Sequence, residues 1–413
     1  MSRPLWCGVA ATILLVGCPD SSGPPTPDAS ADAAPPGAAD IPPPAPPMPP
    51  ALGPCPSGWL DTEVGELRRC EPLFGRTACG PGTAWFAGGE ACEPVGASCP
   101  AAGGFADVEP GPGRRIHVRL GATGDGTASS PYGSVRAALD SAVAGDTILL
   151  AAGVYRDVMV IDKAIRVVGA CVTGTRFSGP VALSPGRILV EAEGVEVRNL
   201  TVNGDGVGLW VRPQGSAHFE DVVVDRAEIG GLTVEGAATG KNLVVQGTRP
   251  TEDGRFGRGI HLESGSTFVL DRAVIQGNRE VGLLAFRAQA ELTDVVIEDT
   301  REDASGVGAG LLAGFGSGVD MRRSVIQGNR GFGVSIDEAG TVFRGEDIVI
   351  RQTEATEAGI GGNGLGARRG AEITLVRGWV AENTLGGVSA IEGSRITIED
   401  SIVEGTRPGA ASG

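Results

Sequence analysis

Lysine, histidine and aromatic side chains are scarce in this chain of 413 residues. Lys163 and Lys241 are its only lysines, it has three histidines, and aromatic residues make up 4% of it. Acidic residues outnumber basic ones by 50 to 34, which gives a formal net charge of −16. Because contacts to phosphate groups need clustered lysine and arginine, this balance argues against a nucleic-acid partner.

Long apolar runs are also missing after the first 18 residues, so no later segment is predicted to span a membrane. Residues 1–17 place Arg3 before a short apolar core, as a signal peptide does. They end in Leu15-Val16-Gly17-Cys18, which resembles the bacterial lipobox, where the cysteine is lipidated. We therefore expect an exported lipoprotein, anchored at the outer membrane or cell surface through Cys18 alone. An ordinary signal peptide with a chance cysteine is the alternative.

Residues 18–53 are rich in proline and alanine and contain runs such as Pro42-Pro43-Pro44. Such a segment cannot bury a core, so we expect a disordered, extended tether. It would hold the rest of the chain away from the membrane.

Residues 54–101 contain five cysteines but no histidine and no Cys-x-x-Cys pair, which disfavours a zinc site. A segment this short needs staples, so the sequence predicts a small disulfide-rich module. Five is an odd number, so we expect Cys171 to pair with one module cysteine and to dock the module on the N-terminal end of the next domain. The pairing of the others stays open. The disulfide candidates are Cys55, Cys70, Cys79, Cys92, Cys99 and Cys171.

Residues 114–413 carry an internal repeat that starts with glycine and an aliphatic residue. The spacing alternates between 23 residues and 28 or 31 residues, at Gly208, Gly231, Gly259, Gly282, Gly310, Gly333, Gly364 and Gly387. A fixed period in this range indicates a solenoid, whose units bury their apolar faces only by stacking. The residue after each glycine and the residue two later are apolar, as in Leu209 and Val211, so both should face the core of a short strand.

A second strand in each unit has two adjacent apolar columns, and the sequence leaves their register open. The first is predicted at Val223, Val244, Val274, Val296, Val325, Val349, Val380 and Ile402. A polar column follows at Thr248, Asn278, Thr300, Asn329, Thr353, Thr384 and Thr406, which suits a turn and an internal ladder. Another mixed column precedes the strand and predicts turn chemistry, at Asp221, Asn242, Arg272, Asp294, Arg323, Asp347, Gly378 and Asp400. Near the start of the domain, residues 134–144 predict an amphipathic helix, N-capped by Ser134, that covers the open end of the core.

These repeats resemble the coil of the single-stranded right-handed parallel β-helix, the fold of pectate-lyase-like proteins. The resemblance extends over roughly residues 116–406 and implies an all-β solenoid with a short N-terminal capping helix behind the disulfide module. The scaffold carries many functions, so the resemblance predicts a fold rather than an activity.

Two sets of residues are candidates for binding. The longer spacings should align loops on one side, with contacts from Arg249, Glu252, Asp253, Arg255, Arg258, Arg301, Glu302 and Asp303. The column between the two inward residues should face outward and offer a ligand face at Trp210, His261, Leu284 and Leu312. Solvated loops and ordinary side-chain stacking are the alternatives.

The sequence singles out no catalytic residue. The clustered calcium ligands and placed base of a pectate lyase, and the paired aspartates and Gly-His-Gly of a polygalacturonase, are not visible. No cofactor or metal site is predicted, with Ca²⁺ at the acidic loops left open. We expect a non-catalytic scaffold or binding module for glycan or a surface protein. The alternatives are a polysaccharide lyase or hydrolase, which a compact cluster of carboxylate, arginine and histidine on one face would favour, and a rod that self-associates through an uncapped C-terminal end.

Overall fold

The computed structural model describes residues 54–64, 67–73, 79–180 and 186–408. The predicted signal peptide, the lipidation site Cys18 and the tether lie outside these residues. Among the described residues α1 (Val135–Ser141) is the one helix, and no helix there is long and apolar enough to cross a membrane.

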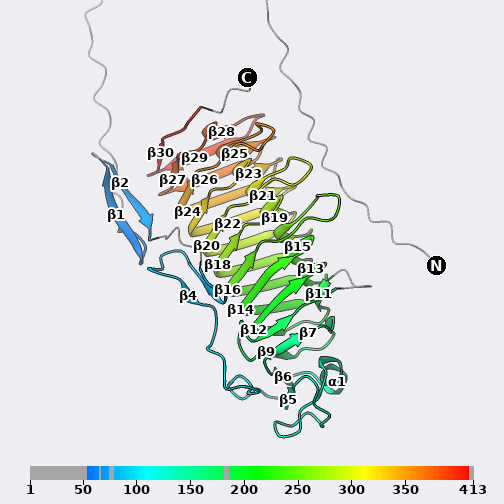
Figure 1. The fold of residues 1–413 in the computed structure, drawn as a ribbon. Helices are drawn as coiled ribbons and strands as arrows, with labels where there is room; N and C mark the ends of the chain where they lie inside the picture. The colour runs from blue at the N-terminus through cyan, green and yellow to red at the C-terminus, as the bar shows by residue number, and fades with distance from the viewer. Residues whose placement is uncertain (1–53, 65–66, 74–78, 181–185, 409–413) are drawn as a thin grey trace, which may run out of the picture. The chain divides into compact units, whose positions relative to one another are not determined.

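Two large parallel sheets contain most of the strands (Figure 1). The ten-stranded sheet consists of β8 (Met159–Ile161), β11 (Gly186–Val190), β13 (Val207–Val211), β15 (Gly230–Val234), β17 (Arg258–Leu262), β19 (Val281–Phe286), β21 (Ala309–Gly314), β23 (Phe332–Asp337), β25 (Asn363–Arg368) and β28 (Gly386–Ala390). The sixteen-stranded sheet consists of β5 (Arg115–Val118), β6 (Thr147–Leu150), β7 (Gly153–Tyr155), β9 (Arg166–Gly169), β10 (Thr175–Phe177), β12 (Val195–Gly204), β14 (Ser216–Ala227), β16 (Ala237–Gln246), β18 (Thr267–Gln276), β20 (Gln289–Glu298), β22 (Gly318–Gln327), β24 (Val342–Arg351), β26 (Glu372–Val376), β27 (Trp379–Ala381), β29 (Arg395–Glu399) and β30 (Ile402–Glu404).

The chain alternates between these sheets and forms a right-handed parallel β-helix. From β11 to β23 each strand of the ten-stranded sheet is followed by a long strand of the other sheet, and β25 is followed by the two shorter strands β26 and β27. Each strand then pairs in parallel with its counterpart one coil later, as β13 does with β15 and β14 with β16. The predicted fold class is therefore confirmed.

The two adjacent apolar columns of the second strand face opposite ways. Val245, Ile275, Ile297 and their counterparts lie in the main core between the sheets. The preceding residues point outward and belong to a separate apolar cluster, which holds Val223, Val244, Val274, Val296, Val325, Val349 and Trp379. The sequence prediction was wrong at one coil: Val349 pairs with Trp379, so Trp379 and not Val380 occupies the outward column.

The glycine that opens each unit is needed for space. A Cβ on Gly282 would lie 2.6 Å from the Gly310 carbonyl oxygen and 3.0 Å from Thr300 Oγ1. On Gly310 it would lie 2.8 Å from Asn329 Nδ2 and from the Gly333 oxygen. The glycine column therefore makes room both for the next coil and for the polar ladder inside the turn.

That ladder alternates threonine and asparagine. Asn278 Oδ1 accepts a hydrogen bond from the Thr248 backbone N–H at 3.0 Å, and Asn278 Nδ2 donates to the Val245 oxygen at 3.2 Å. Asn329 and Asn383 repeat the first of these bonds with the backbone of Thr300 and Thr353. The predicted internal ladder is confirmed, except that its member in the Trp379 coil is Asn383 rather than Thr384.

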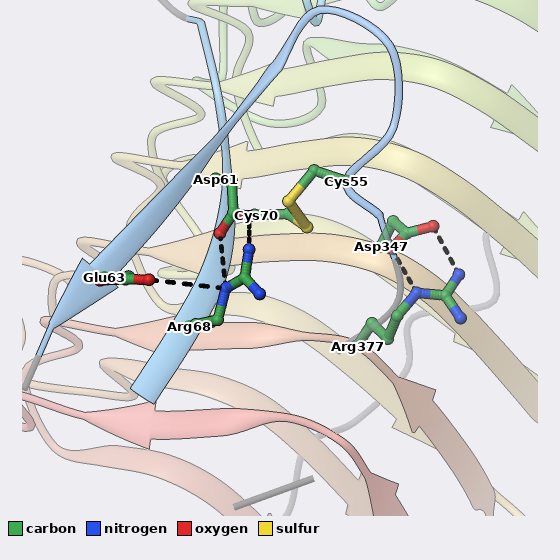
Figure 2. Close-up of a disulfide and its surroundings, with 7 residues drawn as sticks. All are labelled: Cys55, Asp61, Glu63, Arg68, Cys70, Asp347 and Arg377. Carbon is green, nitrogen blue, oxygen red and sulfur yellow. Dashed lines mark hydrogen bonds and ion pairs between the residues drawn. A yellow bond between two sulfur atoms is a disulfide. The ribbon is translucent and has the colours of Figure 1, made fainter. Parts of the chain in front are cut away.

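A second ladder marks the bend within each long strand, where the backbone is left-handed. The φ angle is positive at Asn199, Asp221, Asn242, Arg272, Asp294, Arg323, Asp347, Arg377 and Asp400. Arg323 pairs with Asp294 through two hydrogen bonds, and Arg377 pairs with Asp347 in the same way (Figure 2). The turn interpretation of this column agrees with the structure. In the Trp379 coil, however, Arg377 takes the place predicted for Gly378, because the prediction was one residue too late throughout that coil.

Helix α1 begins as predicted, with Ser134 Oγ accepting the Ala137 backbone N–H at 3.2 Å. Val135, Ala138 and Ala142 are buried in the main core, so α1 covers its N-terminal end. The helix ends at Ser141, shorter than predicted, and leaves Val143 exposed.

The Cys-rich module contains two small antiparallel sheets, β1 (Trp59–Val64) with β2 (Leu67–Pro72) and β3 (Thr83–Ala84) with β4 (Glu93–Pro94). All six predicted cysteines form disulfides, Cys55–Cys70, Cys79–Cys92 and Cys99–Cys171. The predicted link through Cys171 is confirmed. Figure 2 shows the Cys55–Cys70 bridge beside the strands of the β-helix.

The module covers the outward column of the sixteen-stranded sheet. Its residues Trp59, Ala84, Phe86 and Val95 belong to the same buried cluster as that column. The module contacts the β-helix at both ends. Cys99 of the module is bonded to Cys171 in the early coils, and Arg69 of the module pairs with Glu404 in the last coil at 2.6 Å. Docking at the N-terminal end alone was therefore too narrow an expectation, because the module also reaches the late coils (Figure 1).

Candidate binding face

The predicted ligand face lies on the outer side of the ten-stranded sheet. Backbone register joins Trp210, Thr233, His261, Leu284 and Leu312 on successive strands β13 to β21. His261, Leu284 and Leu312 are thus direct neighbours, whereas Thr233 separates Trp210 from them. The structure brings three of the four predicted residues together.

Trp210 itself is not available for stacking. It is 7% exposed and packs with Leu189 and Val207. The Arg212 guanidinium lies 4.6 Å from the centre of its ring. The expectation of an exposed aromatic platform at Trp210 is wrong, because Leu189 of the preceding coil and Val207 of the same strand cover it.

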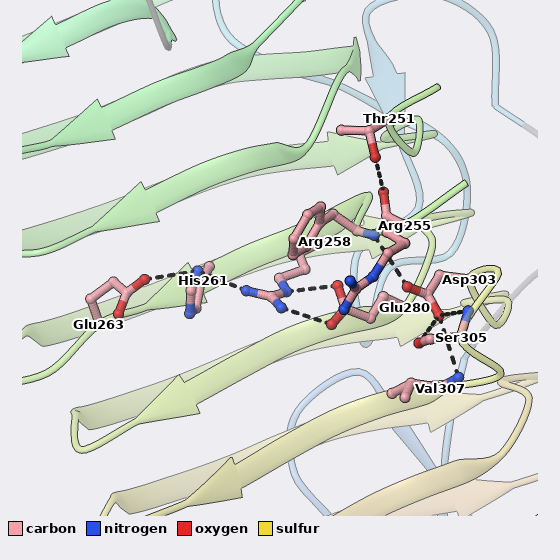
Figure 3. A network of polar contacts seen from close by, with 10 residues as sticks. Thr251, Arg255, Arg258, His261, Glu263, Glu280, Asp303, Ser305 and Val307 are labelled. Atoms are coloured by element: carbon pink, nitrogen blue, oxygen red, sulfur yellow. Dashed lines mark hydrogen bonds and ion pairs between the residues drawn. The ribbon is translucent and has the colours of Figure 1, made fainter. Parts of the chain in front are cut away.

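His261 belongs to a compact polar cluster (Figure 3). Arg258 donates from Nε and Nη2 to the two carboxylate oxygens of Glu280, each at 2.7 Å. Arg258 Nη1 lies 3.3 Å from His261 Nδ1, and Glu263 Oε1 lies 3.4 Å from the same nitrogen. Since an arginine can only donate, Nδ1 accepts from Arg258 and the imidazole is neutral.

The electrostatics of the cluster hold His261 in that neutral form. Burial and the nearby Arg258 lower the pKa of His261 to about 3. Burial raises the pKa of the Glu263 carboxyl, an effect that Arg258 opposes. The arrangement has the carboxylate, arginine and histidine that a polysaccharide-cleaving enzyme would need on one face. However, Arg258 is engaged by Glu280, and an imidazole of such low pKa is a weak base.

An apolar strip adjoins this cluster, and the sequence prediction found only part of it. Leu284 and Leu312 are half-buried neighbours, and Phe286 lies two residues after Leu284, on the same side of β19. The Phe286 and Phe315 rings lie 4.6 Å apart and are half-buried, with the Arg287 guanidinium 5.1 Å and 5.7 Å from their centres. The period-two spacing from Leu284 to Phe286 was the signal that could have found it.

The long loops stack beside the polar cluster, as the alternating spacing predicted. The Ala304 N–H donates to the Gly254 oxygen at 2.8 Å, and the Glu357 N–H donates to Glu302 Oε1 at 2.6 Å. Asp303 accepts from the backbone N–H of Phe256 and of Ser305. Figure 3 shows Asp303 with its loop partners.

Most charged loop residues are used to hold the loops. Arg249 pairs with Asp205 at 3.3 Å, Arg301 approaches Glu354 at 4.0 Å, and Glu302 faces Arg330 at 3.8 Å. Thr251 bonds to Asp253, while Glu252 and Arg255 are exposed. Within the described residues no group of three or more His, Cys, Asp or Glu side chains is placed to hold a metal ion. The loop row therefore resembles a structural ridge beside the sheet more than a charged site.

Comparison with known proteins agrees on the fold. The family model described as right handed beta helix region matches residues 186–345. No curated protein sequence matches the chain.

Three solved structures illustrate the likeness. Pectate lyase Pel9A is 16% identical, with a TM-score of 0.49 over 73% of this chain and 82% of that one. A rhamnogalacturonan lyase is 13% identical, with a TM-score of 0.43 over 71% and 87%. The A-module of the Azotobacter vinelandii mannuronan C-5 epimerase AlgE4 is 14% identical, with a TM-score of 0.43 over 72% and 100%. At such identities and TM-scores these likenesses carry no activity across to this chain.

Proposed function

We propose that this protein is a lipid-anchored, non-catalytic binding module that holds a glycan on the outer face of the ten-stranded sheet. The observation that carries the proposal is the half-exposed pair Leu284 and Leu312 in register beside the Phe286–Phe315 pair. Contiguous apolar surface on a protein is commonly a place of interaction. The C–H faces of sugar rings fit such a strip, and a surface protein is the other partner it would suit.

The neighbouring charges support binding rather than reaction. Arg258 is fixed by Glu280 through two hydrogen bonds, and Asp303 of the long loops accepts hydrogen bonds from the backbone N–H groups of Phe256 and Ser305. Fixed groups of this kind give a rigid surface with a polar border, which suits orientation of a ligand.

The disulfides support export and, with it, the lipid anchor. Three disulfides join the module to itself and to the β-helix, and such bonds persist in oxidising compartments outside the cytoplasm. We propose lipidation at Cys18, so Cys18→Ser should release the protein from the membrane fraction. Membrane retention of that variant would contradict the anchor.

The test of binding uses the oxidised protein with Cys18→Ser and a panel of acidic and neutral polysaccharides, with and without Ca²⁺. Co-sedimentation and polymer length are followed together. We expect one polymer to bind without becoming shorter, and Leu312→Glu to weaken binding at least tenfold. Val269→Glu is the matched control, because Val269 is 44% exposed on the sixteen-stranded sheet. Equal loss in both variants, or binding by neither wild type nor variant, would contradict the proposal.

Polysaccharide cleavage is the second candidate, and the Arg258–His261–Glu263–Glu280 cluster is the observation that favours it. If a polymer becomes shorter, Glu263→Gln and His261→Gln should each abolish shortening while leaving co-sedimentation in place. Shortening that survives both substitutions would place the chemistry elsewhere.

A further inference from the structure

A cavity lies where the module meets the late coils of the β-helix, away from the binding face. Its volume is about 280 Å³, and its walls come from Arg69 and Glu71 of β2, from Arg351 of β24, from Trp379 of β27 and from Glu404 of β30. This is slightly below the roughly 300–1,000 Å³ of pockets for drug-sized ligands, and it suits a single small ring.

The walls are held together by contacts between distant parts of the chain. Arg69 Nη1 donates to Glu404 at 2.6 Å, and Trp379 Nε1 donates to the same carboxylate at 2.9 Å. The Arg69 guanidinium lies 3.8 Å from the centre of the Trp379 ring. Arg351 Nη1 donates to Glu71 at 3.3 Å. The site is therefore formed before any ligand arrives, and it exists only while the module is docked.

The charges of the walls indicate a neutral ligand. Two guanidinium groups, Arg69 and Arg351, stand against the carboxylates of Glu71, Glu382 and Glu404. An acidic ligand would meet this excess of carboxylate, and a cationic ligand would meet the guanidinium groups. A hydroxyl group can donate to a carboxylate and accept from a guanidinium at the same time.

One polar group of the lining is held in place for such a ligand. Gln352 Nε2 donates to Glu382 Oε2 at 2.9 Å, which fixes an amide at the cavity wall.

We propose that this seam cavity binds one neutral, hydroxyl-rich sugar unit between the module and the β-helix. Because both parts supply walls, the bound sugar stabilises the docked module, and binding and docking are thermodynamically linked. The site is separate from the face of the ten-stranded sheet and does not depend on the function proposed for it.

The test uses the full oxidised chain. Glucose, galactose, mannose and N-acetylglucosamine are the neutral probes, with glucuronate and spermidine as charged ones. Saturation-transfer NMR reports binding, and thermal unfolding reports stabilisation. We expect at least one neutral sugar to bind at millimolar concentration and to raise the melting temperature, and both charged probes to bind at least tenfold more weakly.

Gln352→Asn should weaken the neutral sugar at least tenfold, since the shorter amide no longer reaches Glu382 while tolerating the left-handed backbone there. Asp299→Asn is the matched control, because Asp299 has a similar φ angle two coils earlier and does not line the cavity. Arg69→Lys should also weaken binding.

The proposal is overturned if no neutral sugar binds, if glucuronate or spermidine binds better, or if Gln352→Asn and Arg69→Lys both bind like the wild type. Leu312→Glu separates the two sites: it should spare sugar binding at the seam while weakening polymer binding at the sheet face.

Discussion

This β-helix presents apolar side chains to the outside on both sheets, and the two apolar surfaces differ in what covers them. On the sixteen-stranded sheet the column from Val223 to Trp379 is buried beneath the Cys-rich module. On the ten-stranded sheet Leu284, Phe286 and Leu312 stay half-exposed. The solenoid therefore covers one apolar stripe with its own chain and leaves the other accessible, which is why we propose binding at the second.

The largest expected difference between the two stripes is the loss of stability when one apolar residue of each is replaced by aspartate. Val274 is 2% exposed under the module, so Val274→Asp should lower the free energy of unfolding by about 3–5 kcal/mol, the cost of an unpaired buried charge. Leu312→Asp should cost about 1 kcal/mol or less, because its carboxylate reaches water. Urea denaturation measures both, and similar losses in the two variants would remove the distinction between the stripes.

Opening the covalent link of the module should have the next largest effect. Cys99–Cys171 closes a loop with a sequence separation of 72 residues, so replacing both cysteines by serine should cost about 2–4 kcal/mol. Limited proteolysis should then cut the module faster. The Cys79→Ser/Cys92→Ser pair is the control, because it leaves the module tethered, and equal protease sensitivity of the two variants would contradict the account.

His261, which lies at one end of the candidate binding face, should make the stability of the protein depend on pH. The pKa of His261 is lowered to about 3 by burial and by Arg258, whereas histidine in an unfolded chain titrates near about 6.5. Between these values the unfolded state binds more protons, so stability falls as the pH drops from about 6.5 toward 3.

Substitution of His261 should remove this contribution. His261→Gln should lose less stability than the wild type between pH 7 and pH 4, by about 1–3 kcal/mol. Urea denaturation at both pH values measures the difference. Parallel losses in the two proteins would show that His261 is exposed and titrates normally.

Substitutions in the stacked long loops should have the smallest effect on stability and on polymer binding. Arg301 and Glu354 approach only to 4.0 Å and their side chains are 38% and 60% exposed, so Arg301→Ala should change stability by less than about 0.5 kcal/mol. Polymer binding should also change less than twofold. A large loss of binding would transfer the ligand site from the sheet to the loops.

The sequence was sufficient for the β-helix because glycine, inward apolar and polar ladder positions recur under the same steric demands in every coil. The sequence did not reveal which of the two adjacent apolar columns faces outward. The outward valines are covered by the Cys-rich module, so they are as apolar as residues of the main core. The outward column was assigned one residue too late in the Trp379 coil, because that coil has tryptophan where the other coils have valine. Trp210 was predicted to be exposed for a similar reason: its partner Leu189 lies on the preceding coil and Val207 begins its own strand, and strand alternation alone does not reveal either contact.

Hydroxyl-radical footprinting of the oxidised protein tests the contrast between the two stripes most directly. We expect Leu284, Phe286 and Leu312 to be oxidised readily and to become protected by the polysaccharide that co-sediments, while Val244, Val274 and Val296 stay unmodified in both conditions. Oxidation of the valines as fast as that of Leu312, or protection by the polysaccharide outside the ten-stranded sheet, would contradict it.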